Sequence, residues 1–212
     1  MASGTLDIDE LVARLSALPR NRRYIVAVAG PPGSGKSTVS DALLHRLNAN
    51  DPGRAAILPM DGYHYDNGLL TEMGLLARKG APETFDVGGF AQMLTRLAAN
   101  KEPAVAVPVF DRDIEIARAG ARLIPSEADL IIAEGNYLLL GEGPWDMLAP
   151  LFDLTVMVDV KEDELRRRLE ARWRGYGMSD EEISAKVDGN DLPNGLRVLR
   201  NSRPADVVLE NG

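Results

Sequence analysis

The chain has 212 residues, a formal net charge of −8, an apolar fraction of 45% and no cysteine. This length suits one well-packed domain and is short for two. The lack of cysteine excludes a disulfide framework, a thiolate zinc site and a thiol nucleophile. The acidic balance argues against a nucleic-acid binder, which usually has a basic face.

Membrane and export functions are disfavoured as well. No apolar run approaches the ~18 residues that a membrane span needs. The N-terminal stretch, residues 1–9, is acidic and lacks the apolar core of a signal peptide. We therefore expect a cytoplasmic protein that binds neither a membrane nor nucleic acid.

The first elements of the chain are predicted to be a helix, a strand and a second helix. Apolar residues recur at helical spacing in a leading segment, residues 1–22. The β-branched run 24–29 is typical of a strand buried on both faces of a parallel sheet. A glycine-rich turn at 30–37 follows, and 38–47 is predicted to be helical.

The rest of the chain continues this alternation. Further strands are predicted at 55–60, 105–110, 130–133, 154–160 and 207–209, helices at 90–97 and 162–174, and a hairpin arm at 118–124. Residues 62–89 are predicted to form an irregular substrate loop, and Ser179 with Glu182 forms a capping-box pattern that opens another helix. Strands alternating with helices predict a single α/β domain, residues 1–212, in which helices flank a mostly parallel sheet.

The glycine-rich turn carries the clearest functional signal. Residues 30–37 match the phosphate-binding pattern G-x-x-x-x-G-K-[ST] at every fixed position, between an apolar strand and an amphipathic helix. Glycines let backbone N–H groups curl around phosphate oxygens, and the helix N-terminus adds positive charge. We therefore expect a three-layer P-loop NTPase fold that uses ATP and Mg²⁺. The expected nucleotide contacts are Gly30, Pro31, Pro32, Gly33, Ser34, Gly35, Lys36, Ser37 and Thr38.

Within this loop, Lys36 is expected to reach the β- and γ-phosphates, and the Ser37 hydroxyl to ligate Mg²⁺. Ligands of open α/β sheets bind beyond the carboxyl ends of the strands. Glu134 follows an apolar strand and is expected to help hold the metal, because a carboxylate is a hard oxygen ligand. Asp61 follows another strand. From spacing alone, a role as catalytic base and a role as cap of a turn with Gly62 stay equally open.

An arginine-rich helix is the candidate for a mobile lid, predicted over residues 166–190. Arg168 and Arg172 are four residues apart and share one helix face. Mobile arginines suit the negative charge that spreads over a transferring phosphoryl group, so both are predicted to be catalytic contacts. The alternative is a solvated basic face paired with neighbouring glutamates.

Five stretches resemble the P-loop kinase group of uridine kinase, phosphoribulokinase, bacterial-type pantothenate kinase and the fructose-transport-type kinases. They are residues 30–37, 59–64, 78–86, 108–112 and 134–137. The overall pattern is most similar to the fructose-transport-type kinases. The segment after Pro108 lacks both the Tyr-Ser-His of pantothenate kinases and the histidine that uridine kinases place after their Tyr-Asp pair.

This resemblance implies transfer of the γ-phosphate of ATP to a hydroxyl of a small metabolite, foremost a fructose-like sugar or related polyol. Pantothenate and a nucleoside remain alternatives. In such kinases the aspartate at the position of Asp61 is the proposed catalytic base. A substrate-binding insertion, 61–125, would shape the acceptor pocket. Its predicted acceptor contacts, together with one from the 134–137 stretch, are His64, Arg78, Lys79, Phe85, Phe110, Arg112 and Asn136.

The resemblance also implies that Arg203 and Pro204 run beside the adenine. Two other classes of P-loop protein are regulatory GTPase-like switches and ATPase motors or transporter subunits. The chain has no Asn-Lys-x-Asp segment for reading guanine and no Leu-Ser-Gly-Gly-Gln-type signature. The expected partner is a small-molecule acceptor, and a homodimer stays open.

Overall fold

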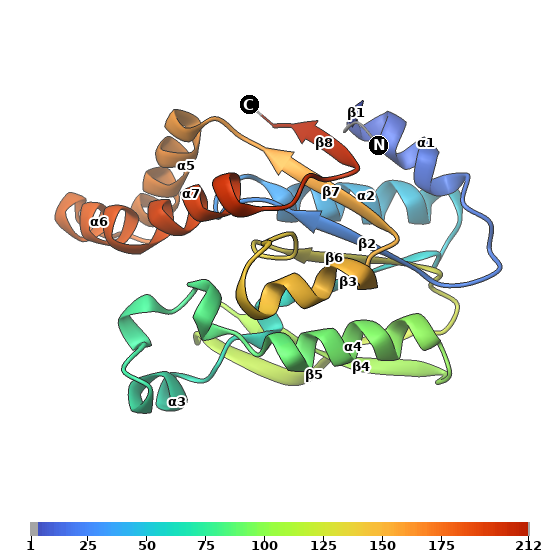
Figure 1. Cartoon of the computed structure of the whole chain (residues 1–212), viewed down its shortest axis with the longest axis horizontal. Coiled ribbons are helices and arrows are strands. Elements are labelled where there is room, and N and C mark those ends of the chain that lie inside the picture. Colours follow the sequence, from blue (N-terminus) through green and yellow to red (C-terminus); the bar gives the residue numbers. More distant parts are fainter. Residues whose placement is uncertain (1–3, 212) are drawn as a thin grey trace.

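The computed structural model describes residues 4–211 (Figure 1). Its strands are β1 (Gly4–Thr5), β2 (Tyr24–Ala29), β3 (Ala55–Pro59), β4 (Ala104–Asp111), β5 (Ile116–Pro125), β6 (Leu130–Gly135), β7 (Leu154–Asp159) and β8 (Val207–Glu210). Its α-helices are α1 (Ile8–Ser16), α2 (Lys36–Asn50), α3 (Asn67–Glu72), α4 (Val87–Ala99), α5 (Glu162–Gly175), α6 (Asp180–Lys186) and α7 (Leu192–Asn201). Short 3₁₀ turns are η1 (Met60–Tyr63), η2 (Leu76–Arg78), η3 (Pro82–Thr84) and η4 (Gly143–Leu151), and η5 (Val187–Asp191) is a π-turn.

Six strands form one parallel sheet in the order β1-β8-β7-β2-β6-β3. Strand β2 lies inside the sheet, and all six of its residues are buried. Because side chains alternate along a strand, Ile25 and Ala27 enter one apolar core and Val26 and Val28 enter the other. The predicted strand buried on both faces is confirmed.

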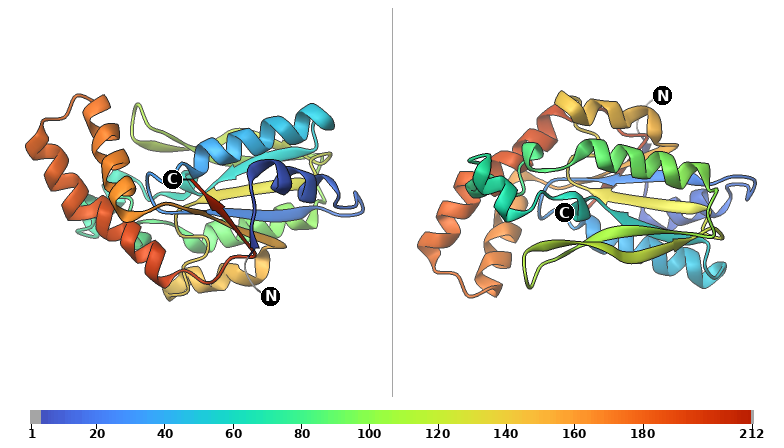
Figure 2. Two further views of the ribbon diagram at one scale, coloured as in Figure 1. Left: turned by 90° about the horizontal axis from the view of Figure 1, so that it is seen from above. Right: turned by 90° about the horizontal axis from the view of Figure 1, so that it is seen from below.

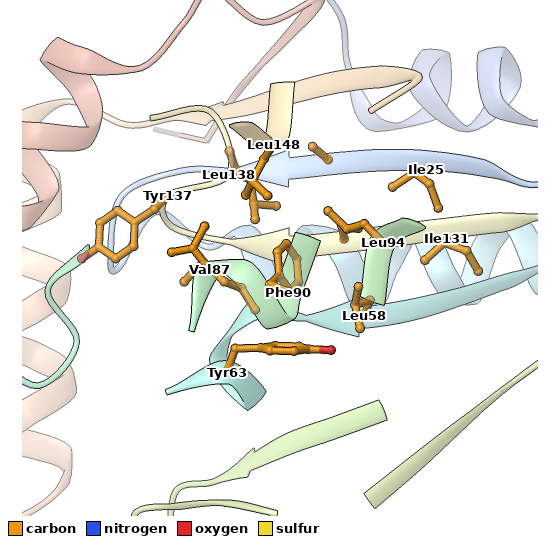
Figure 3. Close-up of a cluster of buried hydrophobic side chains, with 14 of the residues drawn as sticks. Ile25, Leu58, Tyr63, Val87, Phe90, Leu94, Ile131, Tyr137, Leu138 and Leu148 are labelled. Atoms are coloured by element: carbon orange, nitrogen blue, oxygen red, sulfur yellow. The ribbon is translucent and has the colours of Figure 1, made fainter. Parts of the chain in front are cut away.

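Helices cover both faces of this sheet and complete three layers (Figure 2). On one face, α1 and α2 contribute Leu11 and Leu43 to the core. On the other face, Phe90 and Leu94 of α4 lie over the sheet (Figure 3), and Trp145 of η4 joins the same core. The predicted three-layer α/β fold of the P-loop type is confirmed.

Several predicted boundaries shift. The leading helix covers only Ile8–Ser16 of the predicted segment 1–22, because Asp7 caps its start with a capping box and the helix ends before Pro19. The first three residues of that segment lie outside the described part of the chain. Residues 62–89 are not wholly irregular, since α3 and two 3₁₀ turns lie within them.

Strands β4 and β5 pair with each other as a separate antiparallel hairpin. Near the C-terminus, α5, α6, the π-turn η5 and α7 form a small core of their own around Leu165, Leu169 and Val187. Figure 1 shows these helices and α3 at the same end of the molecule, beyond the carboxyl ends of the sheet strands. Within residues 4–211, no helix combines the length and the apolar character that crossing a bilayer would require.

Candidate active site

The loop between β2 and α2 has the geometry of a phosphate cradle. Gly33 and Gly35 have φ angles of 85° and 88°, in the left-handed region that favours glycine. A Cβ atom at Gly30 would lie 2.6 Å from the Ser34 Oγ and 2.9 Å from the Val158 carbonyl oxygen. These glycines are therefore required by backbone shape and by close packing.

The cradle is held from behind by the end of the chain and by α5. The Ser34 carbonyl accepts hydrogen bonds from Asn211 Nδ2 at 2.7 Å and from Arg168 at 3.1 Å. Arg168 also donates to the Asn211 carbonyl at 2.7 Å and is paired with Glu164 at 2.6 Å. The structure thus places Arg168 against the loop backbone, outside the cleft lining, where it supports the cradle.

The two predicted metal-binding residues, Ser37 and Glu134, lie together beside Lys36. The Ser37 hydroxyl donates to Glu134 Oε1 at 3.2 Å, and the Lys36 ammonium lies 3.7 Å from the same oxygen. Burial raises the pKa of Glu134 above its usual range, and the Lys36 charge opposes this shift. The sequence suggests that Glu134 follows a strand. In the structure it is the fifth residue of β6 itself.

These residues fit Mg²⁺ bound together with nucleotide phosphates. A hydroxyl and a carboxylate are hard oxygen donors, which Mg²⁺ prefers, and the ion usually takes its other ligands from water and phosphate. Among residues 4–211, no group of three or more His, Cys, Asp or Glu could hold a metal ion alone. Ser37 and Glu134 would therefore hold the ion as part of a nucleotide complex.

A cleft of about 500 Å³ opens beside the cradle. It brings together residues from the loop, the β3 end, the hairpin and the C-terminal helices. The predicted site residues that line it are Pro32, Lys36, Asp61, His64, Lys79, Phe110, Arg112, Asn136 and Arg172. Residues distant in sequence therefore share one cavity with the P-loop lysine.

Asp61 lies in η1, just beyond β3, and is paired with Arg112 at 2.7 Å. His64 Nδ1 donates to the Asp61 carbonyl at 2.8 Å. The centroid of the His64 ring lies 4.0 Å from that of Phe85 and 4.7 Å from that of Phe110. Burial lowers the pKa of His64, which favours the neutral ring. His64 and its two phenylalanine neighbours thus form an aromatic cluster next to the Asp61 backbone.

Lys79 reaches the same cavity from the loop after η2. Its ammonium donates to Asn67 Oδ1 and to the Glu115 carbonyl, both at 2.7 Å, and lies 4.9 Å from the Phe110 ring centroid. Its side chain is only 14% exposed. Arg78, the other predicted acceptor contact of this segment, is 48% exposed, pairs with Glu83 and does not line the cleft.

The C-terminal helices form the opposite wall. Arg172 and Lys186 lie over the Trp173 ring, 5.1 and 4.3 Å from its centroid. The Trp173 indole donates to Asp191 at 2.6 Å, and burial raises the pKa of Asp191. Arg172, the other predicted lid arginine, therefore lies in the cleft, unlike Arg168.

The sequence does not reveal the contacts that hold the loop of Lys79 and Gly80 in place. Tyr137 donates to the Gly80 carbonyl at 2.6 Å, and Asn190 donates to the Lys79 carbonyl at 3.1 Å. Asn194 is 4% exposed and donates to Asn190. No local motif marks Asn190 or Asn194, and the π-turn beside them is the one structural signal, because such turns are frequent at functional sites.

Three predicted contacts lie elsewhere. Phe85 is 3% exposed and backs His64 without lining the cavity. Arg203 is paired with Asp146, and the segment of Arg203 and Pro204 leads into Asp206, which binds Thr155 at the start of β7. In a parallel sheet the strand starts lie at the edge opposite the P-loop. The adenine contact of Arg203 and Pro204 stays a prediction.

Asn136 follows β6 and lines the cleft, as predicted. Its side-chain oxygen is buried and has no hydrogen-bond partner among the described residues. Buried polar atoms without a partner are uncommon in proteins. This oxygen is thus available to a donor group that enters the cleft.

The comparisons agree with this geometry. Residues 25–194 match the model of the phosphoribulokinase/uridine kinase family. The chain is 36% identical over 202 residues to the uncharacterized protein YggC of Escherichia coli, covering 94% of this chain and 83% of the relative. It is 30% identical over 210 residues to a proposed uridine kinase of Schizosaccharomyces pombe, covering 95% and 89%.

A solved structure is also similar. The crystal structure of a proposed fructose transport system kinase from Silicibacter sp. TM1040 is 39% identical and superposes with a TM-score of 0.88. The match covers 96% of this chain and 98% of that one. The predicted resemblance to this group of P-loop kinases is confirmed.

Proposed function

The chain belongs to the phosphoribulokinase/uridine kinase family, and from this premise we propose that it transfers the γ-phosphate of ATP to an alcohol of a small metabolite. One observation carries the proposal. The P-loop lysine, Lys36, and the carboxylate of Asp61 line the same cleft. A phosphate-binding cation and a candidate base that share one cavity suit transfer to a second substrate.

The reaction balances with these groups. The acceptor hydroxyl loses its proton to the Asp61 carboxylate while its oxygen forms a bond to the γ-phosphorus. The bond from that phosphorus to the bridging oxygen breaks, and ADP leaves with the electron pair. In a loose transition state the base mainly orients the nucleophile, so an ordinary aspartate is sufficient.

The other side chains have assigned roles in this proposal. Lys36 binds the transferring phosphate, and Arg172 meets its developing negative charge from the C-terminal wall. Ser37 and Glu134 would hold Mg²⁺, which supplies charge neutralisation on the phosphates. Residues 61–125 act as the acceptor-binding insertion and residues 166–190 as the lid, both within the single kinase domain 1–212.

For the acceptor we propose a sugar-like polyhydroxy compound. Support comes from the similarity to the proposed fructose transport system kinase and from the polar cleft side chains Asp61, Asn67, Asn136 and Asn194. Pantothenate or a nucleoside is the second candidate class, favoured by the match to the family that includes uridine kinases. A nucleotide-dependent ATPase or switch is the alternative of a different class.

An ADP-release assay with Mg-ATP tests the proposal. Sugars, polyols, sugar acids, sugar phosphates, nucleosides and pantothenate are each added to the purified chain. We expect ADP release that depends on one class of acceptor and an equimolar phosphorylated product. Steady release without any acceptor would indicate an ATPase, and tight ATP binding without release would indicate a nucleotide sensor.

A further inference from the structure

The guanidinium of Arg112 lies beside Asp61, the proposed base, and has N–H donors beyond those that Asp61 uses. Arg112 comes from the loop between β4 and β5, and one of its nitrogens pairs with Asp61 at 2.7 Å. Within residues 4–211, the guanidinium makes this one hydrogen bond, and it carries several further N–H donors. Its side chain is 47% exposed and lines the cleft.

Lys79 supplies a second cation at this end of the cleft. Its ammonium is fixed mainly by neutral oxygens, those of the Asn67 amide and the Glu115 carbonyl, while the Glu115 carboxylate lies at 3.7 Å. Holding a charge at 14% exposure is costly unless it is paired. Among the described residues, the one carboxylate paired with Lys79 is that of Glu115, at the long distance of 3.7 Å and with a side chain that is 59% exposed.

The backbone of Glu115 is adapted to this arrangement. Glu115 has a φ of 55°, in the left-handed region that residues other than glycine rarely adopt. In this conformation its carbonyl accepts the Lys79 hydrogen bond. A left-handed residue is common in the turn of a hairpin, and the carbonyl it presents here helps to fix the Lys79 ammonium inside the cleft.

The cleft as a whole has the opposite sign from the protein. Its lining contains five cationic side chains and three acidic ones, in a chain whose net charge is −8. The cations are Lys36, Lys79, Arg112, Arg172 and Lys186, and the acids are Asp61, Glu115 and Asp191. Lys36 and Arg172 serve the nucleotide in the proposed function, and Lys186 lies over the Trp173 ring on the opposite wall. This leaves Lys79 and Arg112 at the acceptor end.

We infer that the acceptor is an anionic polyhydroxy compound, a sugar acid or a sugar phosphate, whose carboxylate or phosphate is received by Arg112 and Lys79. This inference rests on the proposed kinase function and narrows its acceptor class. Arginine forms paired, charge-assisted hydrogen bonds with both groups. Because Arg112 also holds Asp61, it links the anionic end of the acceptor to the base and so places the hydroxyl beside it. Arg112 is thus a specificity-determining and positioning residue.

The competing reading is that Arg112 contacts the transferring phosphate of ATP. The two readings differ in which substrate loses affinity when Arg112 is replaced. If Arg112 binds the acceptor, its replacement raises the KM of acidic acceptors and leaves the KM of ATP unchanged. A contact to the transferring phosphate depresses turnover of every acceptor alike.

Matched acceptor pairs provide the test on the full chain: glycerol with glycerate, glucose with gluconate, and fructose with fructose 6-phosphate. The first two pairs test a carboxylate on the acceptor, and the third pair tests a phosphate. We expect the favoured acid to exceed its neutral partner in kcat/KM by roughly 10- to 100-fold, the effect of one charge-assisted hydrogen-bonded pair. Arg112→Gln should abolish this preference and Arg112→Lys should restore part of it.

Arg118→Gln is the matched control, because Arg118 lies in the same hairpin, is 58% exposed and pairs with Asp111 outside the cleft. It should leave the preference intact, and Lys79→Met should reduce it. Neutral acceptors used as well as their acids would overturn the inference while the kinase assignment stands. A preference that survives Arg112→Gln would overturn the role of Arg112. Absence of acceptor-dependent ADP release with every pair would instead contradict the proposed function itself.

Discussion

The two ends of the cleft are built in different ways. The nucleotide end is a contiguous loop, residues 30–37, whose shape depends on glycine geometry and on one carbonyl held by Arg168 and Asn211. The acceptor end is assembled from η1, the loop after η2, the β4–β5 hairpin and the C-terminal helices. Function at the first end depends on backbone shape, and at the second end on long-range side-chain contacts.

This difference predicts where mutations act. A change at the nucleotide end should affect every acceptor equally, because all of them share one phosphate donor. A change at the acceptor end should separate one acceptor from another, because specificity depends on a few contacts worth about 1–3 kcal/mol each. The variants below test this division, from the largest expected effect to the smallest.

Replacing Lys36 with alanine should have the largest effect. The change removes the positive charge beside the transferring phosphate, and we expect kcat/KM to fall roughly 10³-fold for all acceptors. Steady-state ADP release measures it. Lys101→Ala, at an exposed lysine between α4 and β4, is the control and should retain normal turnover. Near-normal activity of the Lys36 variant would remove the P-loop assignment.

Asp61→Asn should be next. The amide cannot accept the acceptor proton, so kcat should fall roughly 10²-fold while the Kd of ATP stays within about twofold. Single-turnover kinetics and equilibrium ATP binding measure the two quantities separately. Asp41→Asn, at an exposed position on α2, is the control. A collapse of ATP affinity would place Asp61 in the metal shell and the base elsewhere.

The same division explains what the sequence revealed. The nucleotide end is one continuous segment of the chain, so spacing alone identifies Lys36 and Ser37. Glu134 lies beside them because β6 is the parallel neighbour of β2. At the acceptor end, Lys79 and Arg112 came from a resemblance to known kinases. Asn190 was missed because it meets the Lys79 carbonyl across more than a hundred residues of chain. Asn194 was missed because it acts through Asn190 and no local pattern marks it.

Arg203 and Arg168 do not line the cleft, and both positions have physical reasons. Arg203 precedes β8, and in a parallel sheet the start of a strand lies at the edge away from the P-loop. Arg168 and Arg172 share a helix face by spacing, yet Glu164 and the Ser34 carbonyl hold Arg168 outside the cleft. Spacing on a helix therefore gives a shared face but does not say which partner each side chain meets.

The two lid arginines form a matched pair for the third prediction. Arg172→Gln should lower kcat roughly tenfold or more, because in the proposed function its charge meets that of the transferring phosphate. Arg168→Gln should instead raise the KM of ATP by roughly tenfold and leave kcat within about threefold, because it removes hydrogen bonds that support the cradle. Steady-state kinetics with varied ATP distinguishes them. Equal losses of kcat would show that both arginines reach the phosphate.

The smallest effect is expected for Glu164→Gln, which loosens the support of Arg168 from behind. Hydrogen bonds from Arg167 and Arg168 lower the pKa of Glu164 from 4.5 to about 2. A carboxylate whose pKa is lower in the folded state than in the unfolded state stabilises the fold at pH values above its unfolded-state pKa. That contribution is lost as the pH falls towards the folded-state pKa. The difference in Tm between wild type and variant should therefore be present above pH 4.5 and fade towards pH 2.

Salt should weaken the same difference, because the pair is near solvent. Thermal unfolding over this pH range at two ionic strengths measures it, with Glu170→Gln as the control, since Glu170 pairs with Arg166 at 3.6 Å and has no link to the cradle. We expect Glu164→Gln alone to raise the KM of ATP slightly, with acceptor KM values unchanged. A shift in acceptor preference instead would show that the two ends of the cleft are coupled through α5.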